Sequence, residues 1–165
     1  MSDLYFAANG ASPTTAAQVI MATTAAVNTL LQVAVPSTAD IHVIEWGISL
    51  DTPASAANVK VELLQTDVAA GSGTSLTPTL WGDPNSVASL CVGGAALTMF
   101  NDGAITEGTI TATRMFDVQV LTPPFVYVKQ YPLGREPVIP VSKFLRIRVT
   151  ASVTCNAYCY IIWEE

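Results

Sequence analysis

The sequence predicts an all-β protein, an antiparallel two-sheet β-sandwich that is jelly-roll-like and has about eight strands. Apolar and polar residues alternate with a period of two in several stretches, and turns rich in Gly and Pro separate those stretches at short intervals. No stretch has convincing helical periodicity. Eight short strands in two sheets form the jelly-roll arrangement, which is the fold we expect here.

The C-terminal residues 141–165 read as two strands joined by a short polar turn. In residues 144–151, an apolar face opposes a face that carries Arg146 and Arg148. Residues 157–163 are apolar on both faces, which is typical of a strand covered on both sides. We expect this last strand to close the core. The arginine-bearing face either meets an acidic partner or is a solvated strand face.

The other strands are predicted, in chain order, at residues 27–35, 41–50, 59–66, 76–81, 106–120 and 125–131. In the second of these, alternation places His42, Ile44 and Trp46 on one face. No linker divides the chain, so we expect residues 27–165 to form a single β-sandwich domain.

Residues 1–26 are expected to form an extended N-terminal arm in front of this domain. They are rich in Ala, Thr and Ser, and their threonines and β-branched residues disfavour a helix. Tyr5 and Phe6 are the only aromatic residues in the segment. Such an arm either docks on a neighbouring subunit or is a loose terminus.

The chain of 165 residues is poor in charge: charged residues are 12% of the total, against about 25% in an average soluble domain. A surface with few charges is readily buried against neighbours, because little charge must be desolvated. This composition favours a member of an assembly, and the alternative is a stable β domain with a Thr-rich exterior. The net charge of −6 argues against nucleic acid as a partner.

The sequence offers no motif for catalysis, so we expect no catalytic, metal or cofactor-binding residues and a protein that is not an enzyme. His42 is the one histidine, whereas a metal site of the usual kind needs three or four ligands. No serine lies in a nucleophile elbow. The glycine pair at 71 and 73 lacks the lysine and helix of a phosphate-binding loop.

Three cysteines, Cys91, Cys155 and Cys159, are an odd number that does not fit a disulfide framework. We expect reduced and mostly buried thiols. No secretory signal and no apolar window of about 18 residues is visible. Synthesis in a reducing cytoplasm and no membrane partner are therefore expected.

Five stretches of the sequence resemble one family of proteins: residues 43–51, 59–63, 131–136, 144–151 and 157–165. They are similar to small structural proteins of tailed bacteriophages of actinobacteria, which are described as minor capsid or head-decoration proteins. The similarity covers about residues 27–165 and consists of strand sequences. It implies a β-sandwich that binds the outside of an icosahedral head, often as a trimer, without catalytic or cofactor residues.

We therefore expect a capsid decoration or cement protein that stabilises a tailed-phage head through inter-subunit contacts. Its partners would be the major capsid protein and its own copies, most simply as a homotrimer. It would be made in the cytoplasm of the bacterial host and lie on the exterior of the virion head. The expected contact residues lie in the arm and in the rigid loop 132–140: Tyr5, Phe6, Leu133, Arg135 and Glu136.

An alternative function is also open, a carbohydrate- or receptor-binding virion module of a head fibre or tail. Glycan sites combine aromatic side chains with amides or carboxylates, and the best candidates in the sequence are Trp81, Asp83 and Asn85 in one loop. A loop tryptophan more commonly plugs the end of a sandwich.

Overall fold

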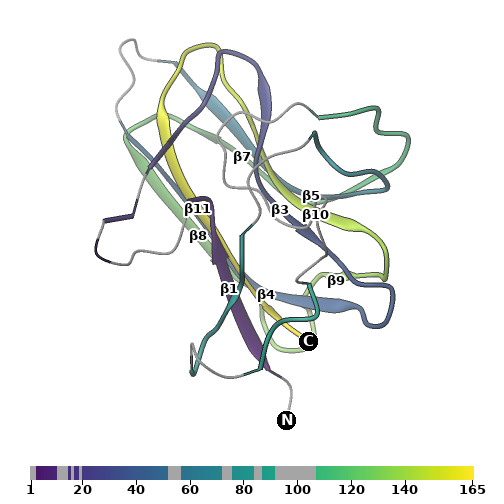
Figure 1. Ribbon diagram of the computed structural model, residues 1–165. Coiled ribbons are helices and arrows are strands. Elements are labelled where there is room, and N and C mark those ends of the chain that lie inside the picture. Colours follow the sequence, from purple (N-terminus) through teal and green to yellow (C-terminus); the bar gives the residue numbers. More distant parts are fainter. Residues whose placement is uncertain are drawn as a thin grey trace.

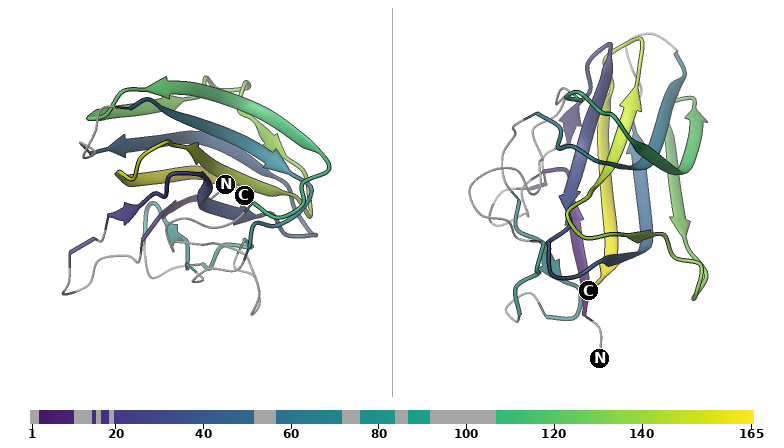
Figure 2. Two further views of the ribbon diagram at one scale, coloured as in Figure 1. Left: turned by 90° about the horizontal axis from the view of Figure 1, so that it is seen from above. Right: turned by 90° about the vertical axis from the view of Figure 1, so that its right-hand side faces the viewer.

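The computed structural model describes residues 3–10, 15, 17–18, 20–51, 57–71, 76–83, 87–91 and 107–165. Within these residues the chain is all-β, with two antiparallel sheets packed as a β-sandwich (Figures 1 and 2). Eight strands have five or more residues: β1 (Leu4–Ala8), β3 (Val27–Ala34), β4 (Ile41–Leu50), β5 (Val59–Thr66), β7 (Thr113–Leu121), β8 (Phe125–Gln130), β10 (Phe144–Thr150) and β11 (Asn156–Glu164). Three have two residues: β2 (Met21–Ala22), β6 (Thr79–Leu80) and β9 (Val138–Ile139).

The larger sheet has the strand order β6-β1-β11-β4-β8, with β2 paired to β11 and β9 paired to β4. The smaller sheet has the order β3-β10-β5-β7. Counted in chain order, the eight longer strands therefore alternate between the sheets as 1-8-3-6 and 2-7-4-5. The predicted β-sandwich is confirmed. The last strand, β11, which was expected to close the core, lies between β1 and β4 in the larger sheet.

The core lies between the two sheets and is built by the inward faces of their central strands. Leu145, Ile147 and Val149 of β10 are fully buried, as are Ile161 and Trp163 of β11. These are the faces that alternation predicts. Removing these side chains from water stabilises the folded state by about 1.5–3 kcal/mol for each large side chain.

On the outer face of the smaller sheet, groups of the same chain bind the arginines of β10, which therefore do not form a free basic face. Arg146 is 0% exposed. Its Nη1 atom donates to the carbonyl oxygen and to Oε2 of Glu107, at 3.0 and 3.1 Å, and its Nη2 atom donates to the carbonyl oxygen of Val68. Arg148 donates through Nε to Glu62 at 2.9 Å. The sequence left two alternatives for this face, contact with an acidic partner or exposure to solvent. Neither is correct for Arg146, because groups of its own chain bury it.

The predicted face of His42 is wrong, because β4 contains a bulge. The register against β11 shifts between Glu45, which pairs with Ile162, and Val43, which pairs with Trp163. The extra residue, Ile44, reverses the side-chain alternation. His42 is therefore exposed, while Trp46 is buried in the core.

The predicted N-terminal arm is wrong for the part that the structure describes. β1 lies inside the larger sheet, between β11 and β6. β2 pairs with the opposite, N-terminal end of the same strand β11. Tyr5 is 2% exposed and stacks on Trp163 with ring centroids 6.1 Å apart. Tyr5 therefore packs in the core of its own chain and is not available for a contact with another subunit. The alternation of Leu4 to Ala8 is too short to distinguish such a strand from an arm.

The three cysteines are free and buried, as predicted. Cys155 directly precedes β11, and Cys159 lies within that strand. Cys91 lies near the C-terminal residue Glu165, because its amide donates to the Ser89 hydroxyl and that hydroxyl donates to Glu165. Burial raises the pKa of the thiols of Cys91 and Cys159. Low nucleophilicity follows, because the thiolate is the reactive form.

Candidate functional site: an apolar edge surface and an aromatic pocket

Two surface features stand out, and the first is at the edge where the two sheets meet. β7 is an edge strand of the smaller sheet and β8 is an edge strand of the larger sheet. Only residues 122–124 connect them, so the two edges lie side by side. Their exposed apolar side chains, 40–68% exposed, form what we name the edge surface: Met115, Val118, Val120, Phe125, Val126 and Val128.

The edge surface is held in place by a polar network between the two strands. The hydroxyl of Tyr127 donates to Asp117 Oδ2 at 2.8 Å, and Lys129 Nζ lies 3.5 Å from the same oxygen. Gln119 Nε2 donates to Asp117 Oδ1 and to the Tyr127 hydroxyl. Burial and the nearby carboxylate raise the pKa of Tyr127 to about 12, so its hydroxyl remains protonated at neutral pH. The network joins the two sheets into one rigid edge.

The loop 132–140 also presents the residues that the sequence analysis selected. Leu133 is 96% exposed, Arg135 is exposed and Glu136 is half-buried. Gly134 has a positive φ of 78°, and the Arg135 amide donates to the Pro132 carbonyl, which closes a tight turn below Leu133. A fully exposed leucine on such a turn is available for contact with another molecule.

The second feature is a row of aromatic rings on the outer face of the larger sheet. Trp81, which follows β6, lies 5.7 Å from the ring of Phe6 on β1. The Phe6 ring stacks on Tyr160 of β11 at 5.8 Å, and Tyr160 lies 6.4 Å from Tyr158. These four rings, which we name the aromatic row, come from three segments that are far apart in the sequence. Cross-strand pairing of Phe6 with Ile162 brings β1 and β11 into this register.

The position of Tyr160 is fixed from two sides. Its hydroxyl donates to Glu45 Oε1 at 2.6 Å, and its ring lies over Gly47 of β4. Burial, followed by the hydrogen bond to Glu45, raises the pKa of Tyr160. The Tyr160 ring, in the middle of the row, is therefore held in place, and its hydroxyl is protonated at neutral pH.

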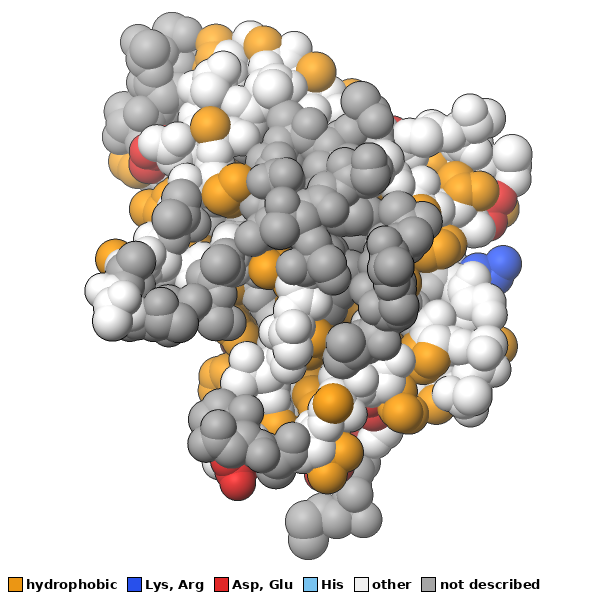
Figure 3. Space-filling view, viewed as in Figure 1, with side chains coloured by type: hydrophobic (Ala, Val, Ile, Leu, Met, Phe, Trp, Pro, Cys, Tyr) orange, Lys and Arg blue, Asp and Glu red, His pale blue; other side chains and the backbone are white. Residues whose placement is uncertain are grey.

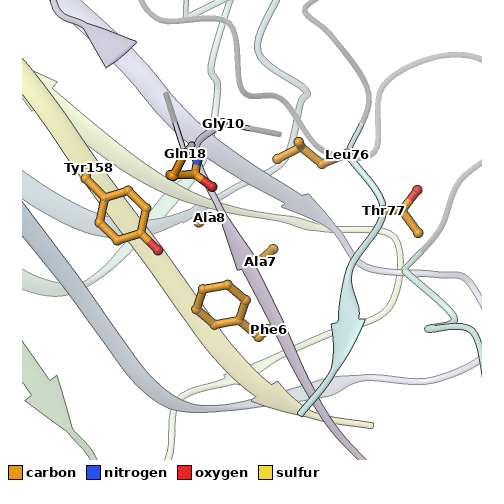
Figure 4. A pocket seen from close by; sticks show the side chains of 8 residues that line it. All are labelled: Phe6, Ala7, Ala8, Gly10, Gln18, Leu76, Thr77 and Tyr158. Atoms are coloured by element: carbon orange, nitrogen blue, oxygen red, sulfur yellow. The ribbon is translucent and has the colours of Figure 1, made fainter. Parts of the chain in front are cut away.

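A pocket of about 330 Å³ opens beside the aromatic row, and two rings of the row, Phe6 and Tyr158, line it (Figure 4). Figure 4 shows the rings of Phe6 and Tyr158 pointing into one space beside β1, with Gln18 at its end. The eight residues that line the pocket are all uncharged: Phe6, Ala7, Ala8, Gly10, Gln18, Leu76, Thr77 and Tyr158. Burial raises the pKa of Tyr158. Its hydroxyl is protonated at neutral pH, as that of a tyrosine ordinarily is, and can donate a hydrogen bond.

The sequence-based glycan site is brought together only in part. Trp81 is 59% exposed, and Asp83 is also exposed, so neither plugs the end of the sandwich. Asn85 lies outside the described residues. The ring next to Trp81 is that of Phe6, and the tyrosines of β11 follow beyond Phe6 in the row. The sequence did not indicate that these residues lie together. Alternation along β11 does place Tyr158 and Tyr160 on one face, and this was the signal for an aromatic surface.

The described residues contain no group of three or more His, Cys, Asp or Glu side chains that could hold a metal ion. Within the same part of the chain, no helix has the length and hydropathy needed to cross a bilayer.

Comparisons of the chain with protein-family models, with curated proteins and with solved structures found no match.

Proposed function

We propose that this chain is a structural virion protein that decorates the outer surface of a tailed-phage head and stabilises it. The observation that supports this most is the edge surface, a set of exposed apolar side chains on two edge strands that lie side by side. Exposed apolar patches on soluble proteins commonly mark contacts with other molecules. The resemblance of the strand sequences to head-decoration proteins supports the same function.

The low charge of the chain also favours assembly. Figure 3 shows a face on which charged side chains are few and scattered among apolar and uncharged polar ones. Docking such a surface costs little desolvation of charge. A shell offers many identical sites, so that weak apolar contacts add up through multivalency.

The edge surface is suited to docking because it is already ordered before contact. The network of Asp117, Tyr127 and Lys129 fixes both strands, so that little conformational entropy is lost on binding. Lys129 and Asp117 also protect the edges against uncontrolled strand addition, since inward-pointing charges blunt edge strands. We infer that partners contact the valine side chains of this surface instead of extending the sheets.

We also propose that the sandwich is a jelly roll. The alternation of strands between the sheets, in the order 1-8-3-6 and 2-7-4-5, supports this, because consecutive strands cross repeatedly from one sheet to the other. Such crossings bring β7 and β8 to the same side of the molecule and so create the edge surface.

The partners in this proposal are the major capsid protein and other copies of the chain, as a homotrimer. Leu133, with its fully exposed side chain, and its neighbours Arg135 and Glu136 are the contact residues that we assign to the loop 132–140. Phe6 is not among these contact residues, because its ring contacts Trp81 and Tyr160 in the aromatic row.

The test is a binding assay with purified empty heads of the virus that encodes the chain. The wild-type protein should sediment with the heads at a fixed stoichiometry, and the double variant V126K/V128K should remain in the supernatant. Ile20→Lys, which changes an exposed apolar residue outside the edge surface, should bind as the wild type does. Equal binding of all three proteins, or binding of none, would refute the proposal.

A further inference from the structure

We propose that the aromatic row and its pocket bind a neutral oligosaccharide. One sugar ring would lie in the pocket against Phe6 and Tyr158, and the next would continue along the row towards Trp81. This site is separate from the edge surface, because β4 lies between β11 and β8 in the larger sheet. The inference does not depend on the proposed role on a phage head.

The pocket exists because two strands diverge. β6 pairs with β1 only at Tyr5 and Phe6, whereas β1 continues to Ala8. The preceding residues Leu76 and Thr77 leave β1 at that point and form the far wall of the pocket. The pocket therefore lies between β1 and the segment that precedes β6. Its volume of about 330 Å³ lies in the range of small-ligand sites.

The lining selects a ligand without charge. None of the described residues that line the pocket is ionised at neutral pH. A charged ligand would lose hydration there without gaining a counter-charge, which is unfavourable by several kcal/mol in general. A neutral ligand with hydroxyl groups does not have this penalty.

The rings select a ligand with flat apolar faces. Sugar rings expose C–H faces that pack on aromatic rings, while their hydroxyl groups project sideways to polar partners. Tyr158 and Gln18 supply such partners beside the Phe6 ring, the Gln18 amide being held by a bond of 3.5 Å to the Asn9 carbonyl. A few polar groups placed around an apolar surface are the usual composition of a ligand site.

The row is longer than the pocket, which favours an oligosaccharide over a single sugar. Phe6 lies in both, and the centroid of Trp81 is 5.7 Å beyond it, with the Trp81 side chain more than half exposed. A second sugar ring can therefore stack on an aromatic face outside the pocket. An extended peptide added along β1 is the competing occupant, and the test includes it.

The test measures binding of the full chain to an array of immobilised neutral oligosaccharides, with acidic oligosaccharides and an alanine–threonine peptide as comparison probes. The strongest neutral probe is then titrated calorimetrically against the wild type and three variants. Trp81→Ala should weaken binding about tenfold and Tyr158→Phe about threefold to tenfold. Phe125→Ala, which removes an exposed aromatic residue of the edge surface, should leave the affinity unchanged.

Both test variants should keep the fold, because Trp81 is exposed and Tyr158→Phe retains the ring. Far-ultraviolet circular dichroism and the thermal midpoint check this before titration. Retention of no neutral probe, preference for acidic probes or for the peptide, or affinities that Trp81→Ala and Tyr158→Phe leave unchanged would each overturn the proposal.

Discussion

The ring of Tyr160 on β11 occupies the space above Gly47 on β4. A Cβ atom at position 47 would lie 2.5 Å from Cε1 of that ring, closer than Cβ atoms approach other atoms in real structures. The same tyrosine is bound through its hydroxyl to Glu45, two residues before Gly47. Glycine is required here by the space that the ring takes, and it holds the aromatic row close to the sheet.

Gly47→Ala is therefore expected to displace the Tyr160 ring and to lower the free energy of unfolding by about 1–3 kcal/mol. In a Tyr160→Ala background the ring is absent, and the same change at position 47 should cost little. The measurement is a double-mutant cycle by urea denaturation. An equal loss in both backgrounds would show that the ring is not the cause.

Arg146 and Arg148 provide a second comparison, because they share a face of β10 and differ in burial. Arg146→Met should lower the free energy of unfolding by about 3 kcal/mol, since it removes the buried guanidinium that binds both Glu107 and the Val68 carbonyl. The loss stays at the lower end for a buried ion pair because Thr29 still donates to Glu107 and Thr66 to the Val68 carbonyl. Arg148→Met should cost about 1 kcal/mol, because Lys60 remains 3.3 Å from Glu62. Guanidinium denaturation of the two variants would contradict this ranking if their losses were equal.

The free energy of unfolding should fall in acid, because the ionised carboxylate of Asp67 stabilises the fold. Hydrogen bonds from the Thr111 hydroxyl and the Ala112 amide lower the pKa of Asp67 from 3.8 to about 2. Because the folded pKa lies below the unfolded one, the stabilisation is complete above pH 3.8 and is lost as the pH falls towards 2.

Thermal midpoints measured between pH 6 and pH 2 test this dependence. Asp67→Asn should be less stable than the wild type at pH 6, and the difference should shrink below pH 3.8. Asp40→Asn, at another exposed carboxyl, controls for the loss of one negative charge. A constant difference between Asp67→Asn and the wild type over the whole range would disprove the role of Asp67.

Cys91, Cys155 and Cys159 are buried and should not react with a thiol reagent in the folded state. Titration with a chromogenic disulfide should detect no fast-reacting thiol in native protein and three in denaturant. A thiol that reacts quickly in the native protein would show that at least one of these side chains is accessible.

Much of the fold follows from alternation in the sequence. The bounds of β4 and β5 agree with those predicted, and β3, β8, β10 and β11 lie where expected. The bulge at Ile44 could not be predicted, because an extra residue becomes visible only against the neighbouring strand. The burial of Arg146 was missed for a related reason: it depends on the loop that follows β5 and on Glu107, not on the pattern of its own strand.

The candidate surfaces were less predictable than the fold. The sequence indicated Trp81 and the tyrosines of β11 separately, and only the sheet order places Phe6 between them. The edge surface depends on β7 and β8 both being edge strands, which alternation does not reveal. The partner contacts in the loop 132–140 stay predictions that the exposure of Leu133 supports.

The role of the edge surface in assembly is tested most directly by hydrogen–deuterium exchange of the free and the head-bound protein. We expect amides of residues 113–130 to exchange more slowly on heads, because β7 and β8 become covered, while amides of the central strand β11 change little. Unaltered exchange across residues 113–130 in protein that is demonstrably bound to heads would contradict the account.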